Sequence, residues 1–112
     1  ENALASVHFE AGLGESPAEY ARAFARLENH YFQNAGFLQQ DGWILANRAR
    51  IEHIPAHIIQ GRFDMICPPL AAWRLSQGWA EANLRLVPLA GHALSEPGIS
   101  AELVRVTDSL RG

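Results

Sequence analysis

The first half of the chain carries the apolar periodicity of an α-helix. Four large apolar side chains recur at spacings of three and four residues and form one stripe: Tyr20, Phe24, Leu27 and Tyr31. We expect Ser16 to cap this helix, with Pro17 at its first position and Glu19 completing a capping box. The stretch 34–36 should end the helix, and a second, short helix is expected over residues 40–50.

The second half alternates between strand and helix patterns. Residues 54–61 and 84–89 are short apolar runs that predict strands, and residues 68–82 and 98–110 predict helices. The last helix has four apolar residues on one side: Ile99, Leu103, Val106 and Leu110. This order predicts a βαβα unit with parallel strands. Because two parallel strands cannot make a complete sheet, we expect the chain to be part of a larger α/β fold.

Composition excludes several classes of protein. The chain is 48% hydrophobic and 19% charged, which is typical of a globular protein. Its net charge of -3, without a basic cluster, argues against a nucleic-acid or membrane-surface partner. No apolar run reaches the roughly 18 residues of a membrane span. Its one cysteine, Cys67, excludes an internal disulfide and fits a reducing compartment such as the cytoplasm.

Two polar residues follow the two predicted strands. Asp64 comes just after the first strand and His92 just after the second. Parallel strands would bring both to one edge of the sheet, where ligands bind in open α/β folds. An Asp that holds a His is the orienting half of a Ser-His-Asp triad, and the order Asp then His is that of α/β-hydrolases. The pattern alone leaves open that Asp64 is a turn or cap residue and His92 a loop residue.

Several motifs resemble the C-terminal part of proline iminopeptidases. They are ARLENHYF (residues 25–32), HIPAHIIQGRFD (53–64), GRFDMICP (61–68) and AGHALSEPGI (90–99). These enzymes are serine peptidases of the α/β-hydrolase fold, with a helical cap, and they release N-terminal proline from peptides. The resemblance implies the last part of a cap in residues 1–37, a connecting segment in 38–54 and the C-terminal part of the hydrolase core in 55–112. It also implies a peptide substrate with N-terminal proline and no metal or organic cofactor.

The resemblance implies roles for six residues. Asp64 matches the triad acid, and His92 matches the triad base. Glu28 matches a cap glutamate that binds the free amino group of the substrate, and Glu1 matches a second amine-binding glutamate. Two further residues match positions that line the proline pocket: Phe32 and Cys67.

Three of these residues could instead have purely structural roles. Glu28 falls on the apolar stripe, where an acid is costly unless it is paired, but it could pair with Arg22 or a neighbouring backbone group instead of a substrate amine. Phe32 alone would be assigned to the core. Cys67 is more typical of a small buried hydrophobe than of a functional thiol. The remaining histidines have no metal-ligand spacing: His8, His30, His53 and His57.

The nucleophile of such an enzyme is missing from the sequence. No G-x-S-x-G elbow and no HGG-type oxyanion segment occurs in the 112 residues. The chain, which does not begin with Met, is therefore expected to be a C-terminal fragment that is inactive without its N-terminal portion. Without the rest of its sheet, the βαβ half is expected to expose a strand edge and apolar helix faces, so the isolated chain should form a homodimer or adopt a rearranged packing. The alternatives are a fragment of another α/β-hydrolase, such as an esterase or epoxide hydrolase, and a non-catalytic domain on the same scaffold.

Overall fold

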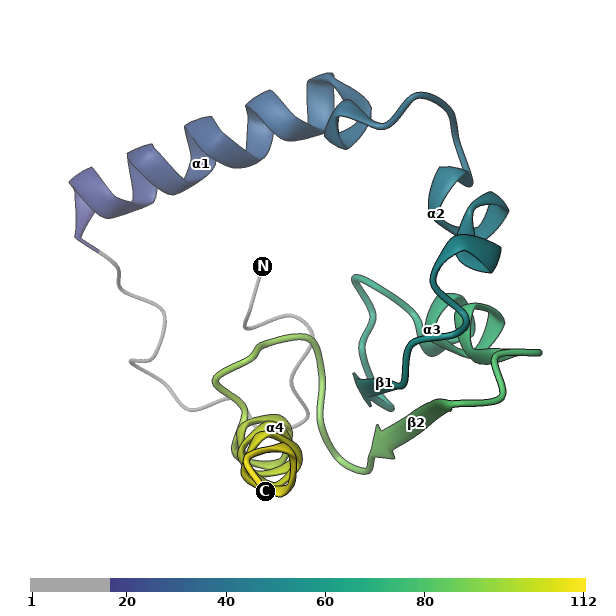
Figure 1. Cartoon of the computed structure of the whole chain (residues 1–112). Coiled ribbons are helices and arrows are strands. Elements are labelled where there is room, and N and C mark those ends of the chain that lie inside the picture. Colours follow the sequence, from purple (N-terminus) through teal and green to yellow (C-terminus); the bar gives the residue numbers. More distant parts are fainter. Residues whose placement is uncertain (1–16) are drawn as a thin grey trace.

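The computed structural model describes residues 17–112, so Glu1 and the predicted Ser16 cap lie outside the described residues. Figure 1 shows an α-helical first half joined by short turns to a strand–helix–strand–helix unit. The elements in chain order are α1 (Ala18–Gln33), η1 (Ala35–Phe37), α2 (Trp43–Ala46), η2 (Arg48–Arg50), β1 (Ala56–Gly61), α3 (Pro69–Ser76), β2 (Ala82–Val87) and α4 (Pro97–Leu110).

The two strands form a parallel pair, which confirms the predicted βαβα unit. Ala56 pairs with Ala82, and the register continues to Gly61 opposite Val87. In Figure 1, α3 and α4 lie on opposite sides of this pair. Both strands therefore end at the same edge, and the residues that follow them begin there.

A small core joins the strands to α4. Val87, Ala90 and Ile99 are buried together, and Ile59 and Leu103 pack against them. Ile59 and Val87 point to the same face of the pair because strand side chains alternate between faces. This packing holds α4 against the end of β2 and places the 88–96 segment between them.

In the second half, two elements end earlier than predicted, and both strands begin two residues away from the predicted starts, at Ala56 and Ala82. The helix expected over 68–82 ends at Ser76, because Gln77 is extended (ψ 124°) and Gly78 takes a left-handed backbone (φ 77°). The strand expected to reach residue 89 ends at Val87, since Pro88 has no N–H for the ladder and Leu89 is left-handed (φ 58°).

The helical half also departs from the prediction in detail. Pro17 occupies the cap position of α1 instead of the first helical position. The predicted helix over 40–50 is wrong in extent: α2 has only four residues, preceded by a left-handed Gly42 (φ 72°), and η2 follows it. On α4, Leu110 is exposed although the periodicity placed it on the apolar side.

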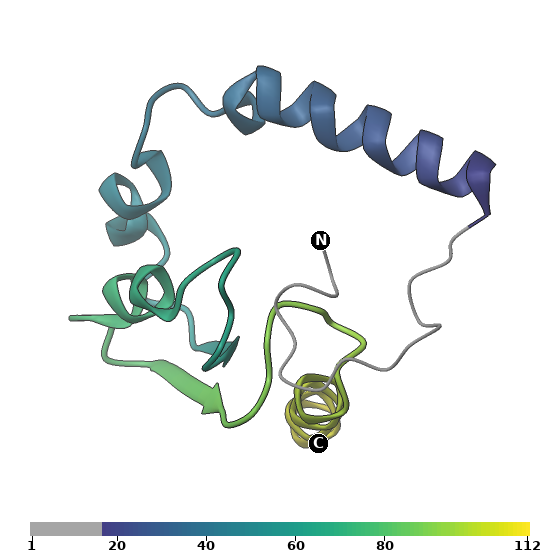
Figure 2. The ribbon, with the colours of Figure 1, turned by 180° about the vertical axis from the view of Figure 1, so that it is seen from behind.

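The chain exposes more surface than a compact domain of its size. Its accessible surface is 8832 Å², whereas the usual scaling gives about 6,100 Å² for a folded monomer of this mass. The excess comes in part from α1, in which no residue is buried. Its apolar stripe is present but exposed, with Leu27 63% accessible. Figures 1 and 2 both show α1 standing apart from the two strands.

Candidate active site

Asp64 and His92 meet at the edge where both strands end. The Nδ1 atom of His92 lies 3.0 Å from Oδ2 of Asp64. Asp64 is buried, with 6% of its surface accessible, and His92 is half-buried. The predicted proximity of the two residues is thereby confirmed, and the contact is a hydrogen bond of ordinary length.

The second oxygen of Asp64 organises its own loop. Oδ1 accepts the backbone N–H of Ile66 at 2.9 Å and that of Cys67 at 2.8 Å. Such bonds are those of an Asp in a turn. Asp64 therefore shapes a turn with one oxygen and contacts His92 with the other.

The hydrogen bonds around Asp64 favour its ionised form. Burial alone would raise the pKa of the Asp64 carboxyl, but the N–H of Cys67, the His92 side chain and the N–H of Ile66 together outweigh it and lower that pKa. An ionised Asp64 can accept the Nδ1 proton of His92. That arrangement leaves Nε2 of His92 as the ring nitrogen that can take a proton from another group.

Backbone contacts tie the two site loops together. The N–H of Arg62 bonds to the carbonyl of Val87 at 3.0 Å, and the N–H of Phe63 bonds to that of Ala90 at 2.9 Å. On the other side of the His92 loop, the carboxylate of Glu96 accepts the N–H of Gly91. Asp64 and His92 thus extend from two segments that are hydrogen-bonded to each other.

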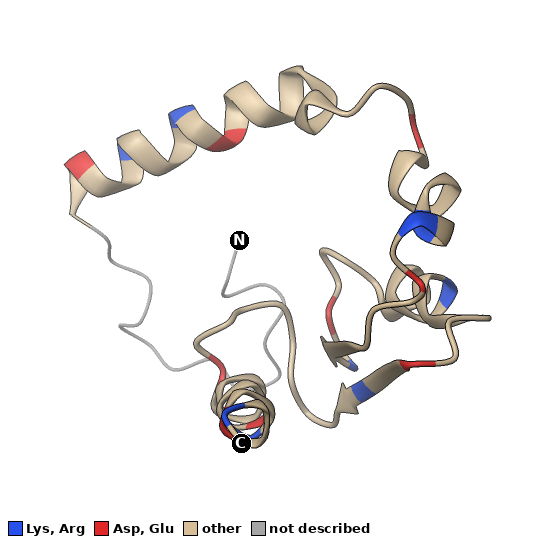
Figure 3. Cartoon of the chain, viewed as in Figure 1, with Lys and Arg blue, Asp and Glu red and all other residues tan. Residues whose placement is uncertain are grey.

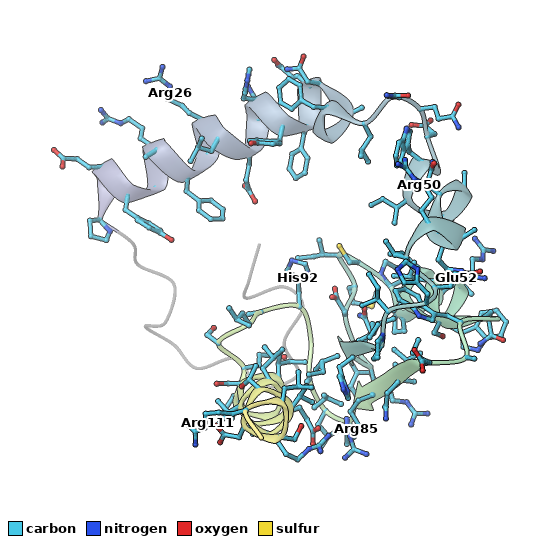
Figure 4. The ribbon with its side chains drawn as sticks, in the orientation of Figure 1. Arg26, Arg50, Glu52, Arg85, His92 and Arg111 are labelled. Carbon is cyan, nitrogen blue, oxygen red and sulfur yellow. The ribbon has the colours of Figure 1, made fainter. Side chains whose placement is uncertain are left out.

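Glu28 lies on the side of α1 that faces the strands. Figure 4 shows Arg26 directed away from the strands, while His92 lies on the side of the strands that faces α1. Glu28 follows Arg26 by two residues and so lies about 200° around the helix. It is half-buried, whereas every other residue of α1 is exposed. Figure 3 marks an acidic position on that side of the helix.

Arg22, the alternative partner that the sequence offers for Glu28, fits the helix geometry poorly. Arg22 precedes it by six residues, which places the two about 9 Å apart along the axis and on different sides of α1. The pairing of Glu28 with Arg22 is therefore disfavoured.

The two predicted pocket residues lie on different elements. Phe32 is near the end of α1, and its side chain is 73% accessible, which contradicts a core position in the described chain. Cys67 is also exposed, so it is not a buried hydrophobe here, and its backbone is bound to Asp64. Cys67 therefore adjoins Asp64, whereas Phe32 belongs to α1.

Curated proline iminopeptidases match most of the chain. The protein of Arabidopsis thaliana is 48% identical over 93 residues, which are 83% of this chain and 24% of that protein. A probable proline iminopeptidase of Leptolyngbya boryana is 49% identical over 90 residues, 80% of this chain and 28% of that protein. The Xanthomonas citri enzyme is 41% identical over 110 residues, 96% of this chain and 35% of that protein. This chain is similar to proline iminopeptidases. No protein-family model matches it.

The proline iminopeptidase-like chain spans about a quarter to a third of the length of these curated relatives. Its two parallel strands and helices are those of an α/β fold, as predicted. Within residues 17–112, no three His, Cys, Asp or Glu side chains gather as a metal site would require. In the same part of the chain, no helix combines the length and the apolar character needed to span a membrane.

Sequence reasoning missed the residues that support Asp64 and His92 at this candidate site. Gln60 and Glu96 gave no signal, because a single amide or carboxylate near a strand end is common. Gly61 did carry one, since it ends a strand directly before a site loop, and a glycine in a strand can mark a close backbone approach. Gly91, four residues after the end of β2, directly precedes His92.

Proposed function

We propose that this chain is the C-terminal part of a proline iminopeptidase, a serine aminopeptidase that releases N-terminal proline from peptides. The observation that carries the proposal is the Asp64–His92 hydrogen bond of 3.0 Å at the shared end of two parallel strands. The similarity to curated proline iminopeptidases over 80% or more of the chain supports it.

In the proposed reaction, a serine outside this chain supplies the nucleophile. Its hydroxyl proton passes to Nε2 of His92 as its oxygen attacks the carbonyl carbon of the N-terminal proline residue. His92 then donates that proton to the leaving amine as the peptide bond breaks and an acyl-enzyme forms. Water, deprotonated by His92, releases proline and restores the serine. Asp64 holds the imidazole and stabilises its protonated form throughout.

We propose that Glu28 binds the cationic amino group of the substrate. Its position on the strand-facing side of α1 and its partial burial suit a carboxylate that meets a charged ligand. Glu1 is proposed as a second carboxylate for the same amine. Phe32 and Cys67 are proposed to contact the proline ring, and residues 1–37 are proposed to be the last part of a cap over the site.

The chain alone is proposed to be inactive. Its sequence contains no G-x-S-x-G elbow, so His92 would have no hydroxyl to deprotonate. The proposed partner is the N-terminal portion of the parent enzyme, which would also cover the exposed stripe of α1. Sedimentation of the chain alone tests a rival partner, since a stable homodimer would show that a second copy pairs with the exposed surfaces of the chain.

A chimera tests the proposed function. This chain would replace the matched segment of the Xanthomonas citri enzyme, which covers 96% of the chain. We expect the chimera to cleave a proline anilide, the chain alone to be silent, and His92→Ala in the chimera to abolish turnover. A folded chimera that hydrolyses esters but not proline substrates would favour another α/β-hydrolase. In that case Glu28→Gln would leave turnover unchanged, because an ester has no cationic amine to neutralise.

A further inference from the structure

Gln60 brings one side-chain amide to three points of the Asp64 loop. Its Nε2 lies 3.1 Å from the carbonyl oxygen of Gly61, 3.0 Å from that of Cys67 and 3.4 Å from Oδ2 of Asp64. All three partners are oxygen acceptors. The amide nitrogen, and not the amide oxygen, must therefore face them.

We propose that Gln60 is a positioning residue for the Asp64–His92 pair. Its amide joins the first residue of the loop, Gly61, to the last, Cys67, and meets the carboxylate between them. The N–H of Cys67 bonds to Oδ1 of Asp64 at 2.8 Å while its carbonyl accepts from Gln60 at 3.0 Å. Cys67 is thus held on both sides, and its N–H stays directed at the carboxylate.

Gln60 also acts on the oxygen that contacts the base. Oδ2 of Asp64 accepts from both His92 and Gln60, whereas Oδ1 accepts from the backbone of the loop. These donors on two sides restrict rotation of the carboxylate about its Cβ–Cγ bond. Without Gln60, Oδ2 of Asp64 has His92 as its remaining hydrogen-bond partner. The loop also loses the side chain that joins its two ends. The orientation of the His92 ring would then vary more.

Nuclear magnetic resonance of the 112-residue chain tests the geometric part of this inference. Gln60→Met and Gln60→Glu both keep the length of the side chain, and at neutral pH neither has a donor. The exposed Gln40 provides the matched control, Gln40→Met. We expect both Gln60 variants to broaden or shift the Nδ1 proton signal of His92. We also expect amide exchange at Cys67 to quicken by about two- to tenfold, as loss of one hydrogen bond predicts.

Kinetics in the chimera test the catalytic part, which rests on the proposed function. Gln60→Met should lower kcat by about tenfold with little change in KM, because misaligned groups slow the chemical step more than they weaken binding. A chimera that is inactive without any substitution at Gln60 would overturn the proposed function. The magnetic resonance data would still test the positioning role of Gln60, because they do not depend on activity. Unchanged His92 and Cys67 signals in both variants would overturn the positioning role. An effect of Gln60→Met without one of Gln60→Glu would overturn it too, because packing and not the donors would be responsible.

Discussion

Gly61 and Gly91 touch through their backbones where the two strands end. A Cβ atom built on Gly61 would lie 1.9 Å from the carbonyl oxygen of Gly91 and 2.8 Å from that of Ala90. Both obstacles are backbone atoms, which cannot swing aside as a side chain can. Because Asp64 and His92 follow these glycines in the chain, their hydrogen bond depends on this close approach.

Gly61→Ala should separate the two site loops. We expect it to lower the free energy of unfolding by about 3 kcal/mol, at the upper end for an overpacked site, because backbone must move. We also expect the Nδ1 proton signal of His92 to be lost. Chemical denaturation and proton spectra measure the two effects. Ser95→Ala, at an exposed position of the same region, is the control. Unchanged His92 signals in a folded Gly61→Ala chain would contradict the prediction.

The lowered pKa of Asp64 predicts how stability depends on pH. The folded state binds the Asp64 proton less readily than the unfolded state, whose value is near 3.8. The stabilisation is therefore present above that value and is lost as pH falls through the lower pKa of the folded state. Asp64→Asn should lower stability at neutral pH and flatten the acid side of the curve.

Denaturation midpoints measured across pH test this prediction. The exposed Asp41 gives the control, Asp41→Asn, which should keep the acid-side shape of the original chain. If Asp64→Asn and the unsubstituted chain lost stability in parallel on acidification, the carboxylate bonds would not be the source of the effect.

Arg48 should stabilise the junction between the helical half and α3. Its guanidinium bonds to Glu52 at 2.9 Å, to the carbonyl of Leu75 at 3.1 Å and to the carbonyl of Gln77. These carbonyls lie at the end of α3, where a cation is favourable. Arg48→Met should cost about 1–3 kcal/mol of unfolding free energy. The exposed Arg50, which Figure 4 labels, supplies the control Arg50→Met. Chemical denaturation measures both variants. Equal unfolding midpoints for Arg48→Met and Arg50→Met would contradict the predicted stabilising role of Arg48.

Apolar truncations should destabilise the two halves of this chain to very different extents. Ile99→Ala removes a side chain that is 7% accessible and should cost about 2–5 kcal/mol. Leu27→Ala changes a side chain that is 63% accessible and should cost about 0.5 kcal/mol or less. In the chimera, if the apolar stripe of α1 is covered, Leu27→Ala should also lower the free energy of unfolding substantially. Thermal unfolding of both variants in both proteins provides the comparison.

The sequence predicted the parts of the fold that repeat a local pattern. Alternating strand and helix signals predicted the parallel pair, and strand polarity then predicted that Asp64 and His92 meet. The ends of elements were less predictable, because single residues such as Pro88 and Gly78 decide them. The exposure of the α1 stripe could not be foreseen, since periodicity shows which side is apolar but not what covers it.

The supporting residues of the site were beyond the reach of the sequence for a different reason. Gln60 contacts Cys67 and Asp64 only because the loop between them folds back on the strand end. Glu96 reaches Gly91 only because α4 starts where it does. Such contacts depend on loop conformation, for which neither residue type nor spacing carries a periodic signal.

Among residues 17–112, the side-chain hydrogen bonds that hold Asp64, His92 and their loops run between residues 60 and 96, and none of them uses α1. If Glu28 binds the substrate amine as proposed, a shift of α1 toward or away from the strands would change how that amine is held and leave the Asp64–His92 hydrogen bond as it is. Substrate recognition and proton transfer would then be mechanically independent of each other.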